Sequence, residues 1–578
     1  MLGGGSVRIQ GQASRRRVVV IAMSLAACDG RGAAGPARGD PTFMTGEPAP
    51  ASAPAWRIPE AAPAVPRSPL ARRLEVFAAE VAARRAERAR PRSEAAPPDL
   101  TSAAGPPAVF DVAGLDAAIH KIVKPLERST DLSVHIRELA PEDVLFDYHG
   151  DAPPNPASNH KLLTAAAALD LLGADFRFET RVLLHDGALH VVGEGDPTLD
   201  EPALRELAAA IAGAVDPAVL RKIVVDDLAF SPRTLAPGFS DEGVGEAYQA
   251  PSGALSLDFN TVEITAVAPR GKLTPGEIVP LVVTLRPQSP HVVVDDQAIV
   301  GRGAVMVRSY AGMELAGQAR TVVALTGKLR AGRTLVERRR VVDPGLYTGG
   351  ALAVMLSEKT GIANLPVERG VAPPPTTDVV WVARRESVPL QQIAGGALAW
   401  SNNFMAEQLL RTLGWRMTGE PGDWDNGARV VQAYWEALGL PAHTLVFENG
   451  SGFSQRGRVT TTALVDLIAV ANRVSGGQGL LSALPVAGEE GTLRARLRRS
   501  GKRVRAKTGT MAGISGLSGV ITAEDGTPQV AFSILSNVRD GGASAAARRK
   551  RAEDAIVTAV LKALDGWALE RSKAGTAP

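Results

Sequence analysis

A change of pattern along the chain most constrains its fold. From about residue 175 to residue 345, strand-like Val-rich runs and turns dominate, among them KIVVDD, VPLVVTLRP, HVVVDD and RTVVALTGKL. The stretch FETRVLLHDGALHVVGEGDPTL contains a hairpin whose turn is Asp186-Gly187. Helix-like runs stand on both sides of this stretch. We therefore expect an α/β layer that is divided in sequence by an inserted β-rich region, residues 175–345.

The flanking segments are expected to form one domain from two parts, residues 107–174 and 346–566. In the first part, LSVHIREL and DVLFDYH predict a hairpin, and the alanine-rich helix that follows is expected to end near Gly173. In the second part, GALAVMLSEKTG, SNNFMAEQLLRTLG, NGARVVQAYWEALG and VTTTALVDLIAVANRVS have helical spacing. The run GLSGVITAEDGTPQVAFSILSN predicts another hairpin, and a final helix over 546–564 precedes a tail, residues 567–578.

The N-terminal residues predict export and a lipid anchor. In RRRVVVIAMSLAACDG, three arginines precede an apolar stretch, residues 18–27, that is too short to span a bilayer. We assign the signal segment to residues 1–28, and LAAC within it resembles a bacterial lipobox in which Cys28 is lipidated. The alternative is an ordinary signal peptide with an incidental cysteine. We expect an exported protein on the periplasmic face of the cell envelope.

Residues 29–106 are expected to be a tether. This segment is rich in Ala, Pro, Gly and Arg, and GEPAPASAPAWRIPEAAPAVPRSP lacks the apolar residues that a core requires. Within it, LARRLEVFAAEVAARRAERAR has the spacing of one short amphipathic helix. No later apolar run approaches the length of a membrane span, so we expect membrane contact through a lipid anchor only.

Composition argues against several classes of function. Hydrophobic residues make up 45% and charged residues 22% of the chain, as is usual for a folded protein. Aromatic residues make up only 4%, and the basic run ARRKRAED is interpreted as a solvated helix face, so no nucleic-acid partner is expected. The chain has a single cysteine and no H-E-x-x-H or Cys–His cluster. We therefore expect no internal disulfide, no metal site and no cofactor.

A serine and a lysine three residues apart form the candidate reactive pair. In PASNHKLL, Ser158 is the only serine of the chain with a lysine at position +3, which is Lys161. Residues i and i+3 share one face of a helix, so the amine can reach the hydroxyl. A partly desolvated lysine loses affinity for its proton and can act as a base, and N–H groups at a helix N-terminus help to hold an oxyanion. The alternative is a helix-capping serine beside a solvated lysine.

The triplet Lys-Thr-Gly occurs twice, and the two copies have different surroundings. The first copy, residues 359–361, closes a helical run, and we interpret it as structural, with Gly361 as the C-cap. The second copy, Lys507-Thr508-Gly509, follows the strand-like KRVRA. A strand edge with a glycine lets a ligand approach the backbone, so we choose the second copy as part of the site.

Ser401-Asn402-Asn403 completes a set of three motifs. It is the only S-x-N of the chain and lies between two helix-like runs, QQIAGGALAW and FMAEQLLRTLG. Together, S-x-x-K, S-D-N and K-T-G mark the penicillin-recognising serine acyl-enzymes, and this chain resembles that group. It departs from the usual motif by having Asn402 in place of aspartate, a position that usually faces away from the substrate.

The resemblance narrows to the D-alanyl-D-alanine carboxypeptidase/endopeptidases of the penicillin-binding protein 4 type (serine peptidase family S13). VVGEGDPTL, APSGALSLDFNTVEI, ENGSGFSQRGRVT, LPVAGEEGTLRARL and RVRAKTGTMAGISGLSGV are similar to segments of that family, over about residues 108–565. The insertion after the nucleophile helix is its most specific mark. The resemblance implies an α/β (α+β) fold of the penicillin-binding protein/serine β-lactamase-like transpeptidase type, with a large β-rich insertion between the nucleophile helix and the rest of the catalytic domain.

The resemblance also implies a catalytic role for each motif residue. Ser158 would be the nucleophile that attacks the carbonyl between two D-alanines, and Lys161 would remove its proton. Ser401 would relay a proton between the lysines and the leaving amine. Asn403 would hydrogen-bond the substrate peptide, and Lys507 would supply positive potential.

The same resemblance assigns substrate binding mainly to the second Lys-Thr-Gly and the residue after it. Thr508 would bind the terminal carboxylate, and Gly509 would leave room for the ligand. The backbone N–H groups of Ser158 and Thr510 would form the oxyanion hole. Ser451, in the turn-rich ENGSGFS, is interpreted as structural or substrate-lining because no lysine or histidine stands near it in sequence.

We therefore expect a serine-type D-Ala-D-Ala carboxypeptidase that also acts as a peptidoglycan DD-endopeptidase. Its substrates would be peptidoglycan stem peptides that end in D-Ala-D-Ala. β-Lactams resemble that end, so they are expected to acylate Ser158 and leave slowly. The alternatives are a serine β-lactamase, against which the insertion argues, and a catalytically idle peptidoglycan-binding protein, against which the intact motifs argue. The sequence specifies no oligomeric state.

Overall fold

The computed structural model describes residue 79 and residues 111–575, apart from 272–273, 275–276, 316, 364, 375–377, 475–478 and 540–545. The predicted signal segment with Cys28, nearly all of the predicted tether and the end of the tail lie outside the described residues. Within the described part of the chain, no helix combines the length and the apolar character needed to cross a bilayer.

One antiparallel sheet brings together the two ends of the described chain. Its strands lie in the order β17 (Val504–Met511), β18 (Ile514–Thr522), β19 (Pro528–Val538), β1 (Thr130–Glu138) and β2 (Val144–Tyr148). Both predicted hairpins are confirmed, β1 with β2 and β18 with β19. Strand β1 also pairs with β19 along its whole length, so the N-terminal hairpin is built into a sheet formed by the C-terminal strands.

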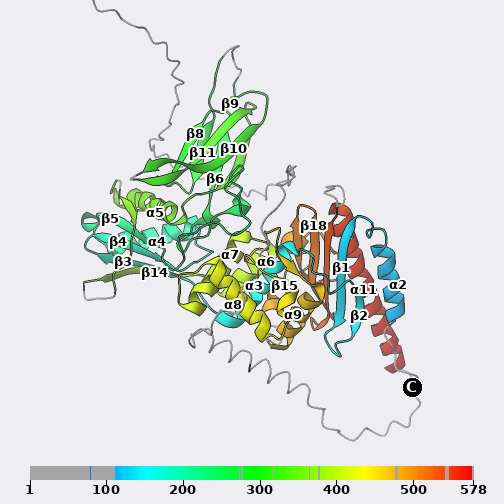
Figure 1. Ribbon diagram of the computed structural model, residues 1–578. Coiled ribbons are helices and arrows are strands. Elements are labelled where there is room, and N and C mark those ends of the chain that lie inside the picture. Colours follow the sequence, from blue (N-terminus) through cyan, green and yellow to red (C-terminus); the bar gives the residue numbers. More distant parts are fainter. Residues whose placement is uncertain are drawn as a thin grey trace, which may run out of the picture.

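Helices cover both faces of this sheet (Figure 1). On one face, α2 (Val112–Val123) and α11 (Ala546–Gly575) share an apolar core with strand residues such as Phe532. Helix α11 begins at the predicted residue but continues past residue 564 into the predicted tail. On the other face, α9 (Thr461–Val474) packs against the sheet in a second apolar core.

A cluster of helices stands against that second face and surrounds the predicted alanine-rich helix. This helix is α3 (Lys161–Leu172), and nearly all of its side chains are buried. It ends at Gly173, as predicted, where the N–H of the glycine bonds to the Leu169 carbonyl. Its neighbours are α6 (Leu390–Ala399), α7 (Asn403–Thr418) and α8 (Trp424–Ala437). The small alanine side chains let these helices approach closely, and the first residues of α3 are thereby fixed deep in the domain.

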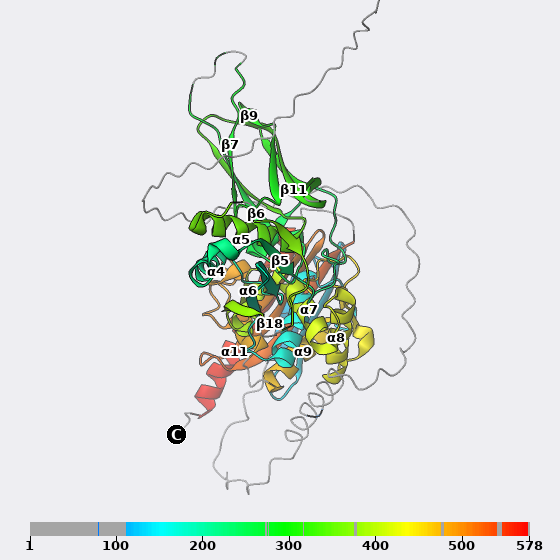
Figure 2. The same cartoon turned by 90° about the vertical axis from the view of Figure 1, so that its left-hand side faces the viewer.

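The inserted region has a hydrophobic core of its own. Figures 1 and 2 show how its strands and helices are arranged. Its main sheet has the order β13 (Val367–Arg369), β5 (Lys222–Asp226), β4 (Ala188–Gly193), β3 (Glu179–His185) and β14 (Val380–Glu386). The hairpin predicted at Asp186-Gly187 is confirmed as the β3–β4 connection. Helices α4 (Glu201–Ala214) and α5 (Pro344–Thr360) pack on this sheet.

The inserted region ends later than residue 345, where the sequence pattern placed its end. Helix α5 belongs to the core of the inserted region, to which it contributes Tyr347, Leu352 and Leu356. Strand β14 also belongs there, because it pairs with β3 and closes the sheet near residue 386. Periodicity identified α5 as a helix but carries no information about which core that helix covers.

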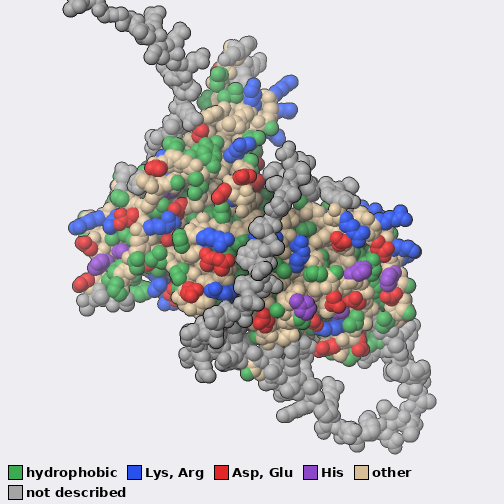
Figure 3. Space-filling model, viewed as in Figure 1, with side chains coloured by type: hydrophobic (Ala, Val, Ile, Leu, Met, Phe, Trp, Pro, Cys, Tyr) green, Lys and Arg blue, Asp and Glu red, His purple; other side chains and the backbone are tan. Residues whose placement is uncertain are grey.

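Two smaller sheets and several short elements complete the described chain. One sheet has the order β12 (Thr334–Arg340), β6 (Thr261–Val267) and β7 (Val282–Arg286), and the other β10 (Val305–Leu315), β11 (Gln318–Leu329) and β8 (Val292–Asp296), with β9 (Ile299–Val300) beside β11. The short elements are β15 (Leu445–Val446), β16 (Arg458–Val459), α10 (Leu480–Ala483), η1 (Ala157–His160), η2 (Pro217–Val219), η3 (Ala247–Gln249), η4 (Asp258–Asn260), η5 (Ala442–Thr444) and η6 (Gly491–Leu493). Acidic and basic side chains are interspersed over the face shown in Figure 3.

Helix α7 joins the helical cluster to the inserted region through a buried arginine. Arg411 donates hydrogen bonds to the carbonyl oxygens of Gly422 at 3.0 Å, Ser252 at 2.7 Å and Ser231 at 2.6 Å. Its guanidinium also lies 4.6 Å from the centroid of the Trp424 ring. Since Ser231 and Ser252 belong to the inserted region, this side chain helps to fix α7 against it.

We predict that Arg411→Ala destabilises the protein by about 3–5 kcal/mol, because buried carbonyl groups lose their donors. Thermal unfolding followed by circular dichroism measures this loss. The control is Arg429→Ala on α8, whose side chain is 68% exposed and whose stability change should stay within about 0.5 kcal/mol. Equal losses in the two variants would contradict a joining role for Arg411.

Candidate active site

The predicted Ser158–Lys161 pair forms a direct contact at the start of α3. Ser158 lies in the single turn η1, and Lys161 is the first residue of the α-helix that follows. The Lys161 Nζ donates to Ser158 Oγ at 2.9 Å. The lysine is only 1% exposed, and the serine side chain makes no helix-capping bond. The geometry therefore differs from a capping serine beside a solvated lysine.

The Lys161 amine is surrounded by neutral oxygen atoms. Besides Ser158 Oγ, it donates to Asn403 Oδ1 at 2.8 Å and to the Ser451 carbonyl at 2.7 Å. Burial lowers the pKa of Lys161 to about 7, although the negative charge of Glu407 acts in the opposite direction. The amine is thus held in position by three segments that are far apart in sequence, and near neutral pH it readily gives up a proton.

The turn that carries Ser158 is held in an unusual backbone conformation. Ala157 has a positive φ of 46°, which is rare for a residue with a side chain. The Asn155 side chain accepts from the Ala157 N–H at 2.9 Å, and the Asn159 side chain donates to the Pro156 carbonyl at 3.0 Å. These local bonds hold the turn in its strained conformation and thereby fix the direction of the serine hydroxyl.

A second buried lysine contacts the predicted S-x-N serine. Lys507, on β17, is fully buried, and its Nζ donates to Ser401 Oγ at 3.0 Å and to the Thr508 carbonyl at 2.5 Å. Burial, and then the positive charge of Lys161, hold the pKa of Lys507 well below its usual value. Ser401 has a positive φ of 56°, so the backbone is strained where the two serine–lysine pairs meet.

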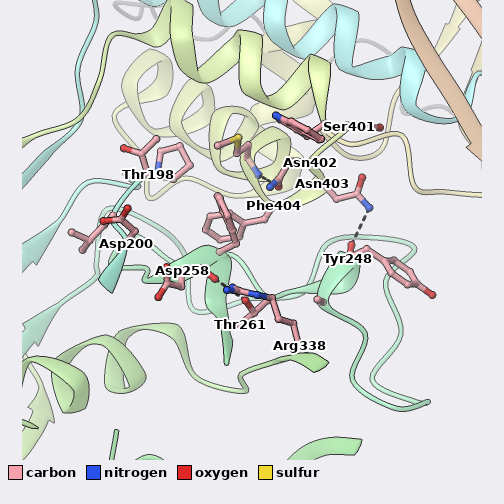
Figure 4. Close-up of a pocket in the computed structure, with 16 residues that line it drawn as sticks. Thr198, Asp200, Tyr248, Asp258, Thr261, Arg338, Ser401, Asn402, Asn403 and Phe404 are labelled. Atoms are coloured by element: carbon pink, nitrogen blue, oxygen red, sulfur yellow. Dashed lines mark hydrogen bonds between the residues drawn. The ribbon is translucent and has the colours of Figure 1, made fainter. Parts of the chain in front are cut away.

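The two asparagines after Ser401 point in different directions. Asn402 is the N-cap of α7, and its side chain accepts from the Met405 N–H at 3.0 Å. Asparagine and aspartate serve equally well as N-caps, which explains why the departure from the usual motif is tolerated here. Asn403 faces the site, where it accepts from Lys161 and donates to the Tyr248 carbonyl at 2.9 Å (Figure 4).

The strand β17 brings the second Lys-Thr-Gly beside the Ser158 turn. Thr508 Oγ1 donates to Thr492 Oγ1 at 2.7 Å, and Thr510 lies exposed near the end of the strand. A Cβ on Gly509 would lie 2.5 Å from Asn159 Nδ2 and 2.6 Å from a backbone oxygen in the same turn. The missing side chain therefore makes room for the serine turn itself.

The first Lys-Thr-Gly lies elsewhere, at the end of α5. Gly361 adopts a left-handed conformation there, with φ 77°, and caps the helix, as predicted. Among the described residues, no three His, Cys, Asp or Glu side chains come together in the way a metal site requires.

Sequence reasoning missed several parts of the site. Glu407 is 1% exposed and close enough to raise the pKa of Lys161 by its charge. Ser451 contributes its carbonyl oxygen rather than its hydroxyl, and Thr492 contacts the second motif. Glu407 could have been suspected, because it follows Asn403 by four residues and so shares its helix face. The other two contacts come from loops that the family resemblance covers, but no local pattern there indicates which atoms face the two lysine motifs.

A cavity of about 590 Å³ adjoins the S-x-N residues (Figure 4). Ser401 and Asn403 lie at one side of it, and the inserted region supplies the opposite wall, including Thr198, Asp258 and Arg338. Burial raises the pKa of Asp258 to about 6. The inserted region thus helps to shape the space next to the paired lysines.

Comparisons with known proteins show which family this chain is similar to. The family model described as D-Ala-D-Ala carboxypeptidase 3 (S13) family matches residues 115–560. The chain is 32% identical over 436 residues to a D-alanyl-D-alanine carboxypeptidase of Actinomadura sp. (strain R39), covering 71% of this chain and 78% of that protein. It is 22% identical over 447 residues to D-alanyl-D-alanine carboxypeptidase DacB of Haemophilus influenzae, covering 72% and 87%. The crystal structure of penicillin binding protein 4 from the same organism superposes with a TM-score of 0.63 and 22% identity, covering 77% of this chain and 99% of that one.

These matches identify a serine peptidase, as the motifs predicted. The chain belongs to the D-Ala-D-Ala carboxypeptidase 3 (S13) family, so its enzyme class is that of the serine-type D-Ala-D-Ala carboxypeptidases, which are hydrolases. The predicted fold class is confirmed as well, since the mixed helix and sheet architecture matches that of penicillin binding protein 4.

We predict that Gly509→Ala lowers the free energy of unfolding by about 1–3 kcal/mol, because the new methyl group overlaps the Ser158 turn. Gly566→Ala on α11 is the matched control, since nothing lies within 4 Å of its new Cβ. There, the higher helix propensity of alanine should raise stability by up to about 1 kcal/mol. Thermal unfolding of both variants measures the difference, and a Gly509→Ala variant as stable as the wild type would contradict the packing role.

Proposed function

We propose that Ser158 is the nucleophile and Lys161 the general base of this carboxypeptidase. The observation that carries the proposal is the 2.9 Å contact between Lys161 Nζ and Ser158 Oγ, made by a lysine that is 1% exposed. The acceptors around the amine are all neutral oxygens, so the amine is not held charged by a carboxylate in direct contact. With a pKa of about 7, neutral Lys161 is available to accept the serine proton near neutral pH.

In the proposed acylation, Ser158 Oγ bonds to the carbonyl carbon of the penultimate D-Ala while its proton passes to Lys161. The C–N bond to the terminal D-Ala then breaks, and the leaving amine takes up a proton. A water molecule hydrolyses the resulting ester, which releases the shortened peptide and restores the free serine. Each step uses only groups of the protein, the peptide and water.

We assign delivery of the proton to the leaving amine to Ser401, with Lys507 beside it. The 3.0 Å contact from Lys507 Nζ to Ser401 Oγ supports this assignment, because it orients the hydroxyl. The positive charge of a protonated Lys507 also favours a substrate that ends in a carboxylate. Thr508 would bind that carboxylate, while Asn403 would hydrogen-bond the peptide.

The oxyanion hole would consist of the backbone N–H groups of Ser158 and Thr510. Support comes from the packing of β17 against η1, which places the Gly509 backbone beside the Ser158 turn. Preorganised N–H donors stabilise the tetrahedral oxyanion without having to reorient during the reaction.

The proposed substrate is a peptidoglycan stem peptide that ends in D-Ala-D-Ala, and we include cross-linked peptides cut by DD-endopeptidase activity. The cavity of about 590 Å³ beside Ser401 supports the second activity, because it offers room for more than a terminal dipeptide. β-Lactams are proposed as covalent inhibitors that acylate Ser158. The Haemophilus influenzae penicillin binding protein 4 has been crystallised in complex with a β-lactam, and its TM-score with this chain is 0.58.

We also propose that the enzyme works outside the cytoplasm, on the periplasmic face of the envelope. The arginine-led apolar segment that ends in LAAC and Cys28 supports export and a lipid anchor. The Ala/Pro-rich residues 29–106 would then separate the catalytic domain from the membrane.

A labelled penicillin should form a stable covalent adduct with the wild-type protein and none with Ser158→Ala. Intact-protein mass spectrometry measures the adduct, and hydrolysis of D-Ala-D-Ala peptides and of cross-linked muropeptides then separates the two peptidase activities. Rapid turnover of the drug without an adduct would identify a β-lactamase instead. An adduct that persists in Ser158→Ala, or no reaction at all in the wild type, would overturn the mechanism.

The rate of acylation should fall as the pH drops below about 7, because protonated Lys161 cannot accept the serine proton. The second-order rate constant for labelled penicillin, measured from pH 5 to pH 9, should therefore rise along a single titration limb. A rate constant that does not change across this range would contradict the role of Lys161 as the base.

A further inference from the structure

Helix α7 presents two side chains to the Lys161 environment, one helical turn apart. Asn403 accepts directly from the lysine amine, at 2.8 Å. Glu407 accepts instead from the backbone N–H groups of Gly450 and Ser451, each at 2.9 Å. The carbonyl oxygen of that same Ser451 accepts from Lys161 at 2.7 Å. Helix α7 therefore controls two of the contacts that orient the amine, one directly and one through the 450–451 turn.

Every contact of the Glu407 carboxylate comes from a donor. Its Oε2 accepts from the Gly450 N–H and from the Trp424 indole N–H at 2.8 Å, while its Oε1 accepts from the Ser451 N–H. An ionised carboxylate is a pure acceptor and fits this surrounding, whereas a side chain with an N–H group does not. Burial raises the pKa of Glu407, and the hydrogen bonds from Ser451, Gly450 and Trp424 oppose that rise.

We propose that Glu407 is a positioning residue for the acylation step: its carboxylate holds the peptide that carries the Ser451 carbonyl, and that carbonyl orients the Lys161 amine. The negative charge of Glu407 also favours the protonated form of that amine. The inference rests on the proposed role of Lys161 as the base. It extends that role by giving a function to Glu407, a buried acid that has no hydrogen bond with Ser158 or Lys161. The same helix also carries Arg411, so the anchor of the inserted region and the support of the base share one rigid element.

The charges that face Lys161 come from several packed elements. Glu407 approaches from α7, and Lys507 approaches from β17. His160, its neighbour in η1, is buried and has a pKa of about 4, so it is neutral near pH 7, and Arg458 acts on that histidine from β16. Among the described residues, Glu407 is the one charge that raises the pKa of Lys161 against the effect of burial, so removing that negative charge should shift the Lys161 pKa downward.

A glutamine at position 407 tests both parts of the role. Glu407→Gln has nearly the same volume, but one of its two polar atoms becomes an NH₂ donor that must face an N–H group of the protein. It therefore loses a bond to the 450–451 turn and removes the charge at the same time. Glu407→Asp keeps the charge but shortens the side chain by one methylene group, so it separates geometry from charge.

Glu553→Gln on α11 is the matched control for the loss of a buried glutamate. Glu553 is also 1% exposed, and it accepts from Ser515 Oγ at 2.5 Å and from Arg496 at 2.9 Å. Helix α7 packs in the apolar core on one face of the sheet and α11 in the core on the other face. The partners of Glu553 are Ser515 and Arg496, neither of which is assigned to the reaction. Its substitution should lower the melting temperature without changing the pH dependence of acylation.

The measurement is the second-order acylation rate by labelled penicillin from pH 5 to pH 9, for the wild type and these three variants, with folding checked by circular dichroism. We expect Glu407→Gln to lower the plateau rate by about tenfold or more and to move the titration midpoint to lower pH. Glu407→Asp should lower the plateau and keep the wild-type midpoint.

The outcomes separate this inference from the proposed function. A wild-type protein that is not acylated, or acylation that survives Ser158→Ala, would overturn the proposed function itself. If the wild type reacts but Glu407→Gln keeps its plateau and midpoint, or behaves like Glu553→Gln, only the positioning role is overturned. If Glu407→Gln does not fold, Glu407→Asp decides, because an unchanged plateau in that variant would also overturn the role.

Discussion

The active site depends on burying the Lys161 amine among neutral oxygen atoms. An isolated ammonium is expensive to bury, and the structure offers it hydrogen bonds rather than a carboxylate in direct contact. The neutral form of the amine is consequently more favoured in this site than it would be in water. The serine hydroxyl beside it thereby has a proton acceptor. The acceptors come from η1, from the start of α7 and from the loop around Ser451, so the pair functions only when these segments are assembled.

Helix α7 connects the Lys161 amine to other parts of the molecule. Its first residue, Asn403, binds the amine, Glu407 binds the loop behind it, and Arg411 binds backbone carbonyls of the inserted region. These positions recur every four residues, so they lie along one polar face of the helix, half-buried at Asn403 and buried at Glu407 and Arg411. The inserted region is thus connected to the chemistry by the same rigid helix, and it also lines the cavity beside Ser401.

Much of this organisation was predictable from local patterns. The hairpins β1–β2, β3–β4 and β18–β19 follow from alternating apolar residues and turn signals, and Gly173 and Gly361 end their helices as expected. The end of the inserted region was not predictable, because the periodicity of α5 is the same whichever core it covers. The packing of Gly509 was not predictable either, since the motif does not reveal that the Ser158 turn occupies the space beside it.

The sequence by itself determined the chemical groups of this protein, their order and the family to which it belongs, because serine, lysine and glycine at fixed short spacings are local properties of the chain. Only the tertiary structure decided how those groups act on one another. The contact of Lys161 with Ser451 spans 290 positions of sequence and that of Lys507 with Ser401 spans 106. Residues so far apart in sequence come into contact only when the hydrophobic cores form. Formation of these cores also buries both lysines, and burial lowers their pKa values. A lysine in the sequence is a cation by default, and the fold is what makes Lys161 available as a base.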